Sequence, residues 1–170
     1  GGWHSRAFAG EPLPSLEAIA RFVQRNGHAL NIEIKPTPGL ERETGRAVAL
    51  EAARLWQGRA APPPLLSSFV PESLAAARDA VPALPRALLL DALADGWFEQ
   101  ARSLACSAVV TAYPLMDAAL IARLHGAGLR ALCYTVNDSA EAERLLALGI
   151  DGIITDAVDR FSPAGATLLD

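Results

Sequence analysis

Residues 31–36, with the sequence Asn-Ile-Glu-Ile-Lys-Pro, carry the side chains best suited to chemistry. Successive side chains of a β-strand point to opposite faces, so Ile32 and Ile34 share one face while Glu33 and Lys35 share the other. Both faces of a parallel sheet are normally apolar. Two opposite charges on one face therefore indicate either a structural ion pair or a functional site, and we favour the functional site.

Lys35 is the only lysine of the chain, and the other fourteen of its fifteen basic residues are arginine. An ammonium group is a compact point charge with rotatable donors, whereas a guanidinium is a larger planar fork. The ammonium suits a single phosphate oxygen or a developing negative charge. The use of lysine at this one position predicts a catalytic role for Lys35.

Glu33 has the chemistry of a metal ligand, since carboxylate oxygens are the ligands that Mg²⁺ and Ca²⁺ prefer. We predict one divalent cation, Mg²⁺ or Ca²⁺, at Glu33, with Lys35 offsetting the remaining charge of a phosphate. One carboxylate alone makes a poor metal site. Asp156 ends another predicted strand and Asp91 follows a third, but we expect the further acidic ligands from strands upstream of Gly1.

Small polar and aromatic residues end several of the other predicted strands. Ser68 and Phe69 end one strand, and Tyr134 and Asn137 stand at the end of another. We predict all four as substrate-binding residues that orient a phosphate and a hydroxyl group. Alternatives stay open: Ser68 is equally suited to cap the next helix, Asn137 to shape a turn, and Tyr134 to pack in the core.

Short apolar runs rich in branched residues alternate with longer amphipathic runs, which is the pattern of strand and helix units with a parallel sheet. The predicted strands cover residues 30–35, 65–69, 86–90, 108–112, 130–135 and 152–155. The predicted helices cover residues 15–26, 41–56, 71–80, 96–104, 116–127 and 140–148. The fold class is therefore α/β.

After the first crossover the strands recur about every 22 residues, which is the repeat of a minimal strand and helix unit. This regularity predicts a (β/α)₈ TIM barrel, which typically has about 250 residues. A helix precedes the first predicted strand, although a crossover helix needs a parallel strand on each side. We therefore expect about six of the eight strands, in a single partial domain over residues 1–170 that is truncated at its N-terminus. An open dinucleotide-binding sheet is the alternative, but no Gly-x-Gly-x-x-Gly follows a predicted strand.

The formal charge of −4 and the isoelectric point of about 5.4 disfavour nucleic acid and membrane surfaces as partners. No apolar run approaches the roughly 20 residues that span a bilayer, so we expect no membrane insertion. A small local anion site, such as one for a small-molecule substrate, is compatible with this charge, and the oligomeric state stays open. Cys106 and Cys133 are isolated and lack metal-ligand spacing, which predicts buried reduced thiols.

Several strings of residues resemble glycerophosphodiester phosphodiesterases in content and order. They are residues 30–36 (Leu-Asn-Ile-Glu-Ile-Lys-Pro), 65–69 (Leu-Leu-Ser-Ser-Phe), 134–137 (Tyr-Thr-Val-Asn) and 151–156 (Asp-Gly-Ile-Ile-Thr-Asp). Residues 10–14 and 85–91 resemble the bacterial cytosolic type of this family. The resemblance covers nearly the whole chain.

The resemblance implies a (β/α)₈ barrel of the PLC-like phosphodiesterase type. It also implies hydrolysis of glycerophosphodiesters to sn-glycerol 3-phosphate and an alcohol, by metal-assisted acid/base cleavage in the cytoplasm. Glu33 would be a ligand of Mg²⁺ or Ca²⁺, and Lys35 would contact the phosphate. The resemblance places four more residues in the substrate pocket: Ser68, Phe69, Tyr134 and Asn137.

The family's histidine-arginine-glycine motif, its other acidic metal ligands and its second histidine all fall upstream of Gly1. General acid/base transfer contributes about 10² to 10⁴-fold to a rate, so we expect this chain alone to be inactive. Two alternatives stay open. One is an aldolase-like barrel with Lys35 as a Schiff-base nucleophile, and the other is a non-catalytic partial barrel that acts as a binding or structural module.

Overall fold

Six strands alternate with six α-helices over residues 2–161, the part of the chain that the computed structural model describes. The strands are β1 Asn31–Glu33, β2 Leu65–Ser68, β3 Arg86–Leu90, β4 Ala108–Ala112, β5 Arg130–Tyr134 and β6 Gly152–Ile153. The helices are α1 Leu16–Asn26, α2 Glu41–Trp56, α3 Pro71–Ala80, α4 Trp97–Ser103, α5 Ala118–Gly126 and α6 Ser139–Ala147. Every predicted strand and helix is therefore present.

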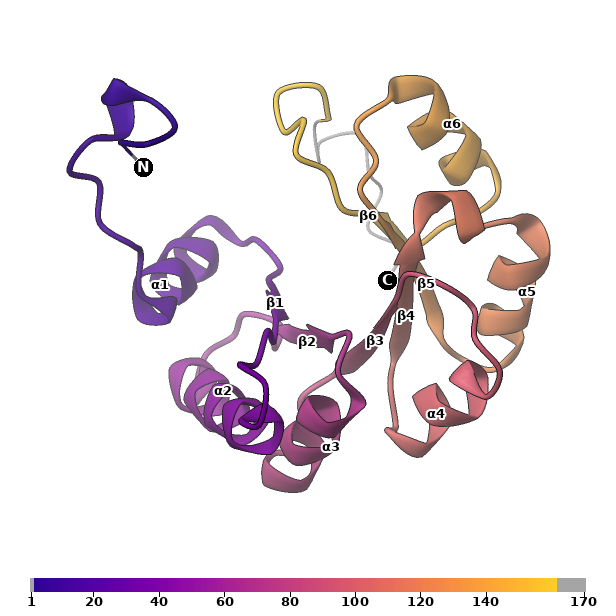
Figure 1. Cartoon of the computed structure of the whole chain (residues 1–170), viewed down its shortest axis with the longest axis horizontal. Helices are drawn as coiled ribbons and strands as arrows, with labels where there is room; N and C mark the ends of the chain where they lie inside the picture. The colour runs from indigo at the N-terminus through magenta and orange to yellow at the C-terminus, as the bar shows by residue number, and fades with distance from the viewer. Residues whose placement is uncertain (1, 162–170) are drawn as a thin grey trace.

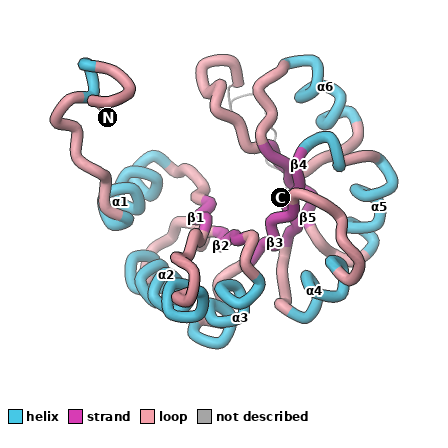
Figure 2. Tube along the Cα trace, viewed as in Figure 1, coloured by secondary structure: helices cyan, strands magenta, loops and turns pink. Residues whose placement is uncertain are grey.

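All six strands are parallel, and their order in the sheet is their order in the chain. An open doubly wound sheet would reverse its strand order at a switch point. The sheet instead curves, and helices α2 to α6 cover its outer side (Figures 1 and 2). The described residues thus form six consecutive strands of a (β/α)₈ barrel, with β1 and β6 at the two edges.

The helix ends follow local capping chemistry. Ser15 accepts a hydrogen bond from the Ala18 amide before α1, and Gly27 adopts the left-handed conformation after it. Four predicted starts were wrong by one or two residues, because the N-cap residues of α1, α4, α5 and α6 are Ser15, Gly96, Asp117 and Asp138. Asp117 and Asp138 accept hydrogen bonds from amides three residues further along. Two short 3₁₀ helices, Arg6–Phe8 and Tyr113–Leu115, were not predicted.

The main core lies between the outer face of the sheet and the helices. Buried residues of β3 to β5 pack there against residues of α5 and α6; they include Leu88, Val109, Cys133, Leu124 and Leu145. Cys106 belongs to the same core, and both cysteines are free and buried, which confirms the prediction. The inner face carries a smaller cluster around Leu89 and Val110, as expected of a barrel whose interior is packed.

Helices α2 and α3 approach closely behind β1 and β2. A side chain at Gly45 of α2 would place its Cβ 2.8 Å from the Cα of Ser73 and closer still to the Ser73 carbonyl oxygen. The Ser73 hydroxyl donates a hydrogen bond of 2.9 Å to the carbonyl oxygen of Glu41. This contact fixes the two helices that support the ends of β1 and β2.

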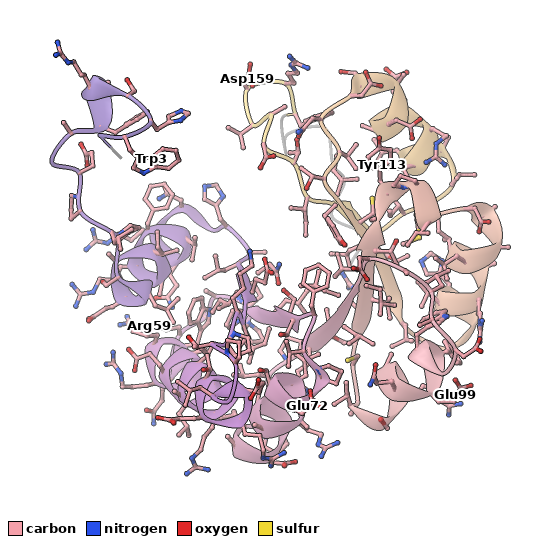
Figure 3. The ribbon with its side chains drawn as sticks, in the orientation of Figure 1. Trp3, Arg59, Glu72, Glu99, Tyr113 and Asp159 are labelled. Atoms are coloured by element: carbon pink, nitrogen blue, oxygen red, sulfur yellow. The ribbon has the colours of Figure 1, made fainter. Side chains whose placement is uncertain are left out.

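The N-terminal segment up to α1 lies apart from the sheet. Trp3 is 91% exposed, and Figure 3 shows it at a distance from the strands. None of the helices within residues 2–161 is both long and apolar enough to cross a bilayer.

Candidate active site

The carboxyl end of β1 presents one charged and one apolar face. Ile34 is buried in a cluster with Leu66 and Ala52, behind the sheet. The side chains of Glu33 and Lys35 remain 33% and 77% exposed. This is the alternation that the strand pattern predicts, and it places both charges at the end of a strand where barrel enzymes carry their catalytic groups.

Glu33 and Lys35 form a loose ion pair. The Lys35 Nζ lies 3.4 Å from the Glu33 Oε1, whereas a charge-assisted hydrogen bond between such groups is about 2.7 to 2.9 Å long. Exposed pairs of this kind contribute about 0 to 1 kcal/mol to stability. Each charge is therefore free to engage a ligand at little cost to the fold.

The two serines of β2 point to opposite faces. Ser67 is the register partner of Glu33 and shares its face, so Ser68 points to the other face. The Ser68 hydroxyl donates to the Ile34 carbonyl oxygen at 2.7 Å and accepts from the Val70 amide at 3.1 Å. Ser68 thus holds β1 to the loop before α3, and the structure does not bring its hydroxyl to Glu33 and Lys35.

Ser67 is the residue of this site that the sequence argument missed. It is fully buried, and its Oγ has no hydrogen-bond partner among residues 2–161. The sequence shows two adjacent serines, and only the register between β1 and β2 decides which one faces Glu33. No signal in the sequence fixed that register.

Phe69 and Tyr134 form an aromatic wall beside the charged pair. Their rings meet edge to face, with centroids 5.7 Å apart, and Phe69 is 43% exposed. The Tyr134 hydroxyl donates to the carbonyl oxygen of Leu90 at 3.1 Å. Burial, and then the carboxylates of Asp91 and Glu33, raise the pKa of Tyr134. The phenol therefore stays neutral and lies within electrostatic reach of Glu33, although they stand on different strands.

Asn137 belongs to a second cluster at the ends of β5 and β6. Its Oδ1 accepts hydrogen bonds from the Thr155 hydroxyl at 3.0 Å and from the Asp156 amide at 2.9 Å. The guanidinium of Arg160 donates to the Asn137 carbonyl oxygen at 3.2 Å. These bonds join the loop after β5 to the segment after β6, so the recorded contacts of Asn137 are structural.

A divalent cation fits these residues only in part. Glu33 supplies one hard oxygen donor of the type that Mg²⁺ and Ca²⁺ require. Residues 2–161 contain no group of three or more histidines, cysteines or acids arranged to hold a metal ion. The described part of the chain therefore does not complete a metal site by itself.

The arrangement is suited to binding a phosphorylated ligand. Lys35 offers a mobile ammonium that can donate to a phosphate oxygen. The exposed ring of Phe69 lies on the same side of the sheet as Tyr134, and such a wall can cover the apolar part of a small molecule. Few polar groups on a partly apolar surface are typical of small-molecule sites.

Over residues 1–160 the chain matches the Glycerophosphoryl diester phosphodiesterase family. A protein of Bacillus subtilis (strain 168) named "Putative glycerophosphodiester phosphodiesterase YhdW" is 30% identical over 167 residues, covering 94% of this chain and 65% of that protein. A second protein of the same organism, named "Glycerophosphodiester phosphodiesterase", is 27% identical over 177 residues, covering 95% and 59%. This chain thus spans less than two thirds of the length of these relatives.

Solved structures share the fold. A phosphodiesterase of Oleispira antarctica, in complex with the product sn-glycerol-3-phosphate, has a TM-score of 0.82 and 26% identity, covering 94% of this chain and 64% of that one. A protein of Silicibacter pomeroyi has a TM-score of 0.75 at 24% identity, covering 86% and 54%. The second likeness supports the fold alone.

Proposed function

Because this chain belongs to the glycerophosphoryl diester phosphodiesterase family, we propose that the protein hydrolyses glycerophosphodiesters to sn-glycerol 3-phosphate and an alcohol. The reaction would serve phospholipid and glycerol metabolism. The observation that carries the proposal is the pairing of Glu33 with the only lysine of the chain at the end of β1. No apolar packing or stability argument accounts for these two charges there.

Lys35 would bind the phosphate of the substrate. Its side chain is exposed and, within residues 2–161, makes no polar contact other than the loose ion pair with Glu33, so its ammonium can turn to a phosphate oxygen without breaking a strong bond. In that position it would stabilise the negative charge that develops during cleavage. Removing one such donor typically costs about 10² to 10³-fold in rate.

Phe69 and Tyr134 would line the pocket for the rest of the substrate. The ring of Phe69 is exposed beside Tyr134, which suits it to direct contact. Ser68 would support the site through the main chain of Ile34, since its hydroxyl is committed there. Asn137 would contact substrate through its amide N–H groups, because both recorded bonds of its side chain use Oδ1.

Glu33 would supply one ligand of a divalent cation, Mg²⁺ or Ca²⁺. Such an ion would neutralise phosphate charge when bound. The remaining ligands would come from outside residues 2–161, since these residues do not form a complete metal site. The role of Glu33 is therefore testable apart from that of Lys35.

Acid/base groups would also come from elsewhere in the protein. His125 lies at the opposite end of the sheet from Glu33. Its Nε2 is 2.8 Å from the carboxylate of Asp151, which also accepts a hydrogen bond from the Ala131 amide at that end. Histidine is the most frequent acid/base group of enzymes. We propose that parts of the protein outside residues 2–161 supply such histidines, and that the 170-residue chain alone is inactive.

The geometry disfavours the Schiff-base alternative. A nucleophilic lysine is normally desolvated in an apolar pocket or placed beside another cation. Lys35 is instead 77% exposed and lies beside a carboxylate. A non-catalytic partial barrel would leave the exposed charges of β1 without a role.

The proposal is tested by release of glycerol 3-phosphate from glycerophosphocholine. The protein is produced from the reading frame that contains this chain together with its upstream codons, and release is followed with and without a chelator. Chelator-sensitive release is expected. Absence of release, together with borohydride trapping of a carbonyl substrate on Lys35, would contradict the proposal and support the aldolase-like barrel with Lys35 as a Schiff-base nucleophile.

We propose a cytoplasmic location as well. The support is the resemblance of residues 10–14 and 85–91 to the bacterial cytosolic type of the family. Recovery of the protein in the cytoplasmic fraction of the source cells is the expected result, and recovery in another fraction would contradict it.

A further inference from the structure

Ser67 carries a hydroxyl that the fold leaves without a partner. It lies in β2 opposite Glu33 of β1, and its side chain is fully buried. Among residues 2–161, its Oγ is the one buried side-chain polar atom without a hydrogen bond. Buried polar groups of native proteins are nearly always hydrogen-bonded, so an exception needs an explanation.

The neighbouring serine shows how the same group is normally satisfied. Ser68 is equally buried, and its hydroxyl makes two hydrogen bonds with the main chain of Ile34 and Val70. An unpaired buried hydroxyl destabilises a protein, because it has left water without gaining a partner. Natural proteins keep such violations mainly at functional sites. The contrast between adjacent serines therefore indicates that Ser67 acts in the site.

Glu33 is the partner within reach of Ser67. Neighbouring strands lie about 4.8 Å apart, and directly opposed residues project to the same face. The Glu33 carboxylate now leans toward Lys35, at 3.4 Å, which is longer than a charge-assisted hydrogen bond. A rotation of the Glu33 side chain would bring the carboxylate to the Ser67 hydroxyl instead.

We propose that Ser67 is a positioning residue for Glu33. When Lys35 binds the phosphate of a ligand, the Glu33 carboxylate turns away from Lys35 and accepts a hydrogen bond from the Ser67 Oγ. One carboxylate oxygen is then fixed, and the other stays free for the divalent cation that the proposed function assigns to Glu33. The inference rests on the proposed function for the identity of that ligand, a glycerophosphodiester or its phosphorylated product.

Supporting groups of this kind have measurable effects. Removing a hydrogen-bond partner of a functional carboxylate typically lowers activity about 10- to 100-fold. Ser67→Ala should therefore lower kcat/KM at least tenfold. It should also raise the Tm of the ligand-free protein by about 2 to 4 °C, because an unpaired buried hydroxyl is removed. Loss of activity combined with a gain of stability is not expected from a purely structural residue.

Two further variants separate hydrogen bonding from packing. Ser68→Ala is the matched control, and it should lower the Tm because it removes a fully bonded hydroxyl of equal burial. Ser67→Cys keeps nearly the same volume but offers only a weak donor. Its kcat/KM should therefore resemble that of Ser67→Ala.

The result that would overturn the inference is an unchanged kcat/KM in Ser67→Ala, or a fall in its Tm like that of Ser68→Ala. If the wild type releases no product, the proposed function fails on that ground, and calorimetry with glycerol 3-phosphate then decides the inference. Affinity at least tenfold weaker in Ser67→Ala supports it. Equal affinity, or no binding by the wild type, overturns it.

Discussion

Lys35 and Glu33 face each other at the end of β1, with Nζ 3.4 Å from Oε1. The pair is exposed and loose, so it adds little to stability. Their neighbours Ile32 and Ile34 pack into the apolar cluster behind the sheet. One strand thus anchors itself with two side chains and presents the two others to a ligand.

Replacement of Lys35 should abolish most activity without unfolding the protein. Lys35→Met is expected to lower kcat/KM for glycerophosphocholine about 10² to 10³-fold, because one charged donor to the phosphate is lost. Its free energy of unfolding should change by less than about 0.5 kcal/mol, since the side chain is 77% exposed. Lys35→Arg should not restore activity, because a planar fork cannot replace a point charge.

The control for Lys35 is Arg46→Met. Arg46 is an exposed cation of α2 and is not part of the proposed site. Its kcat/KM should stay within about twofold, since a distant exposed charge is screened by salt. Equal losses in both variants would mean that net charge, rather than the position of Lys35, controls the rate.

The close contact of α2 with α3 depends on Gly45. In Gly45→Ala the new Cβ would collide with the main chain of Ser73, and overpacking of this kind costs about 1 to 3 kcal/mol. Gly126→Ala is the matched control, because apart from its chain neighbours and the backbone of its own helix no atom lies within 4 Å of the Cβ it adds. That variant should be unchanged or up to about 1 kcal/mol more stable. Urea unfolding of both measures the difference.

Arg86 holds the amino ends of the sheet together. Its buried guanidinium donates to the carbonyl oxygens of Pro82, Leu84, Leu104 and Ala105, at 2.6 to 3.2 Å. Burial lowers its pKa, although an arginine remains charged at physiological pH. Arg86→Leu should destabilise the protein by at least about 2 kcal/mol, because it leaves these carbonyl groups unpaired.

Arg102→Leu is the comparison for Arg86, since Arg102 is an exposed residue of α4. Its free energy of unfolding should change by less than about 0.5 kcal/mol. Arg86→Lys should restore only part of the loss, because lysine lacks the five donors of a guanidinium. Urea midpoints that are alike for Arg86→Leu and Arg102→Leu would contradict the structural role of Arg86.

The protein should lose stability at high pH because its two cysteines are buried as free thiols. Burial raises the pKa of Cys106 and of Cys133 to about 11 each, opposed by nearby Arg86 and Arg144. The folded protein holds these protons more tightly than the unfolded chain, where a thiol titrates near 8.5. The contribution to the free energy of unfolding is therefore complete below about pH 8.5 and is lost as the pH rises through about 11.

Urea unfolding between pH 8 and pH 11 measures this effect. The wild type should lose more stability over that range than Cys106→Ala/Cys133→Ala. Part of the slope above pH 10 should remain in the variant, because burial also raises the pKa of Tyr134. At pH 8 neither thiol of the native protein should react rapidly with a disulfide reagent, and parallel stability curves would contradict the assignment.

The elements of the fold were predictable because their local signals are strong. Helices α2 and α3 and strands β3 and β4 have the predicted bounds. Each is a periodic or branched apolar run between clear stop signals, such as Pro71 at the first turn of α3. Asp117 and Asp138 were missed as caps because neighbouring residues were equally plausible helix starts.

The site was predictable only where strand alternation decides it. Glu33 and Lys35 share a face whatever their neighbours, so sequence alone placed them together. Which serine of β2 faces them depends on the register with β1. The hydrogen bonds that the Asn137 side chain accepts depend on where the segment after β6 packs. Both are long-range relationships that a local pattern does not encode.

The most direct test of the account compares Glu33→Gln with Glu43→Gln in the assay for glycerol 3-phosphate release. Both variants remove one carboxylate charge, but Glu43 is an exposed residue of α2 outside the site. Glu33→Gln should lower kcat/KM at least 100-fold, whereas Glu43→Gln should change it by no more than about twofold. If the wild type is sensitive to the chelator and Glu33→Gln nevertheless keeps full activity, the assignment of the site to the end of β1 is contradicted.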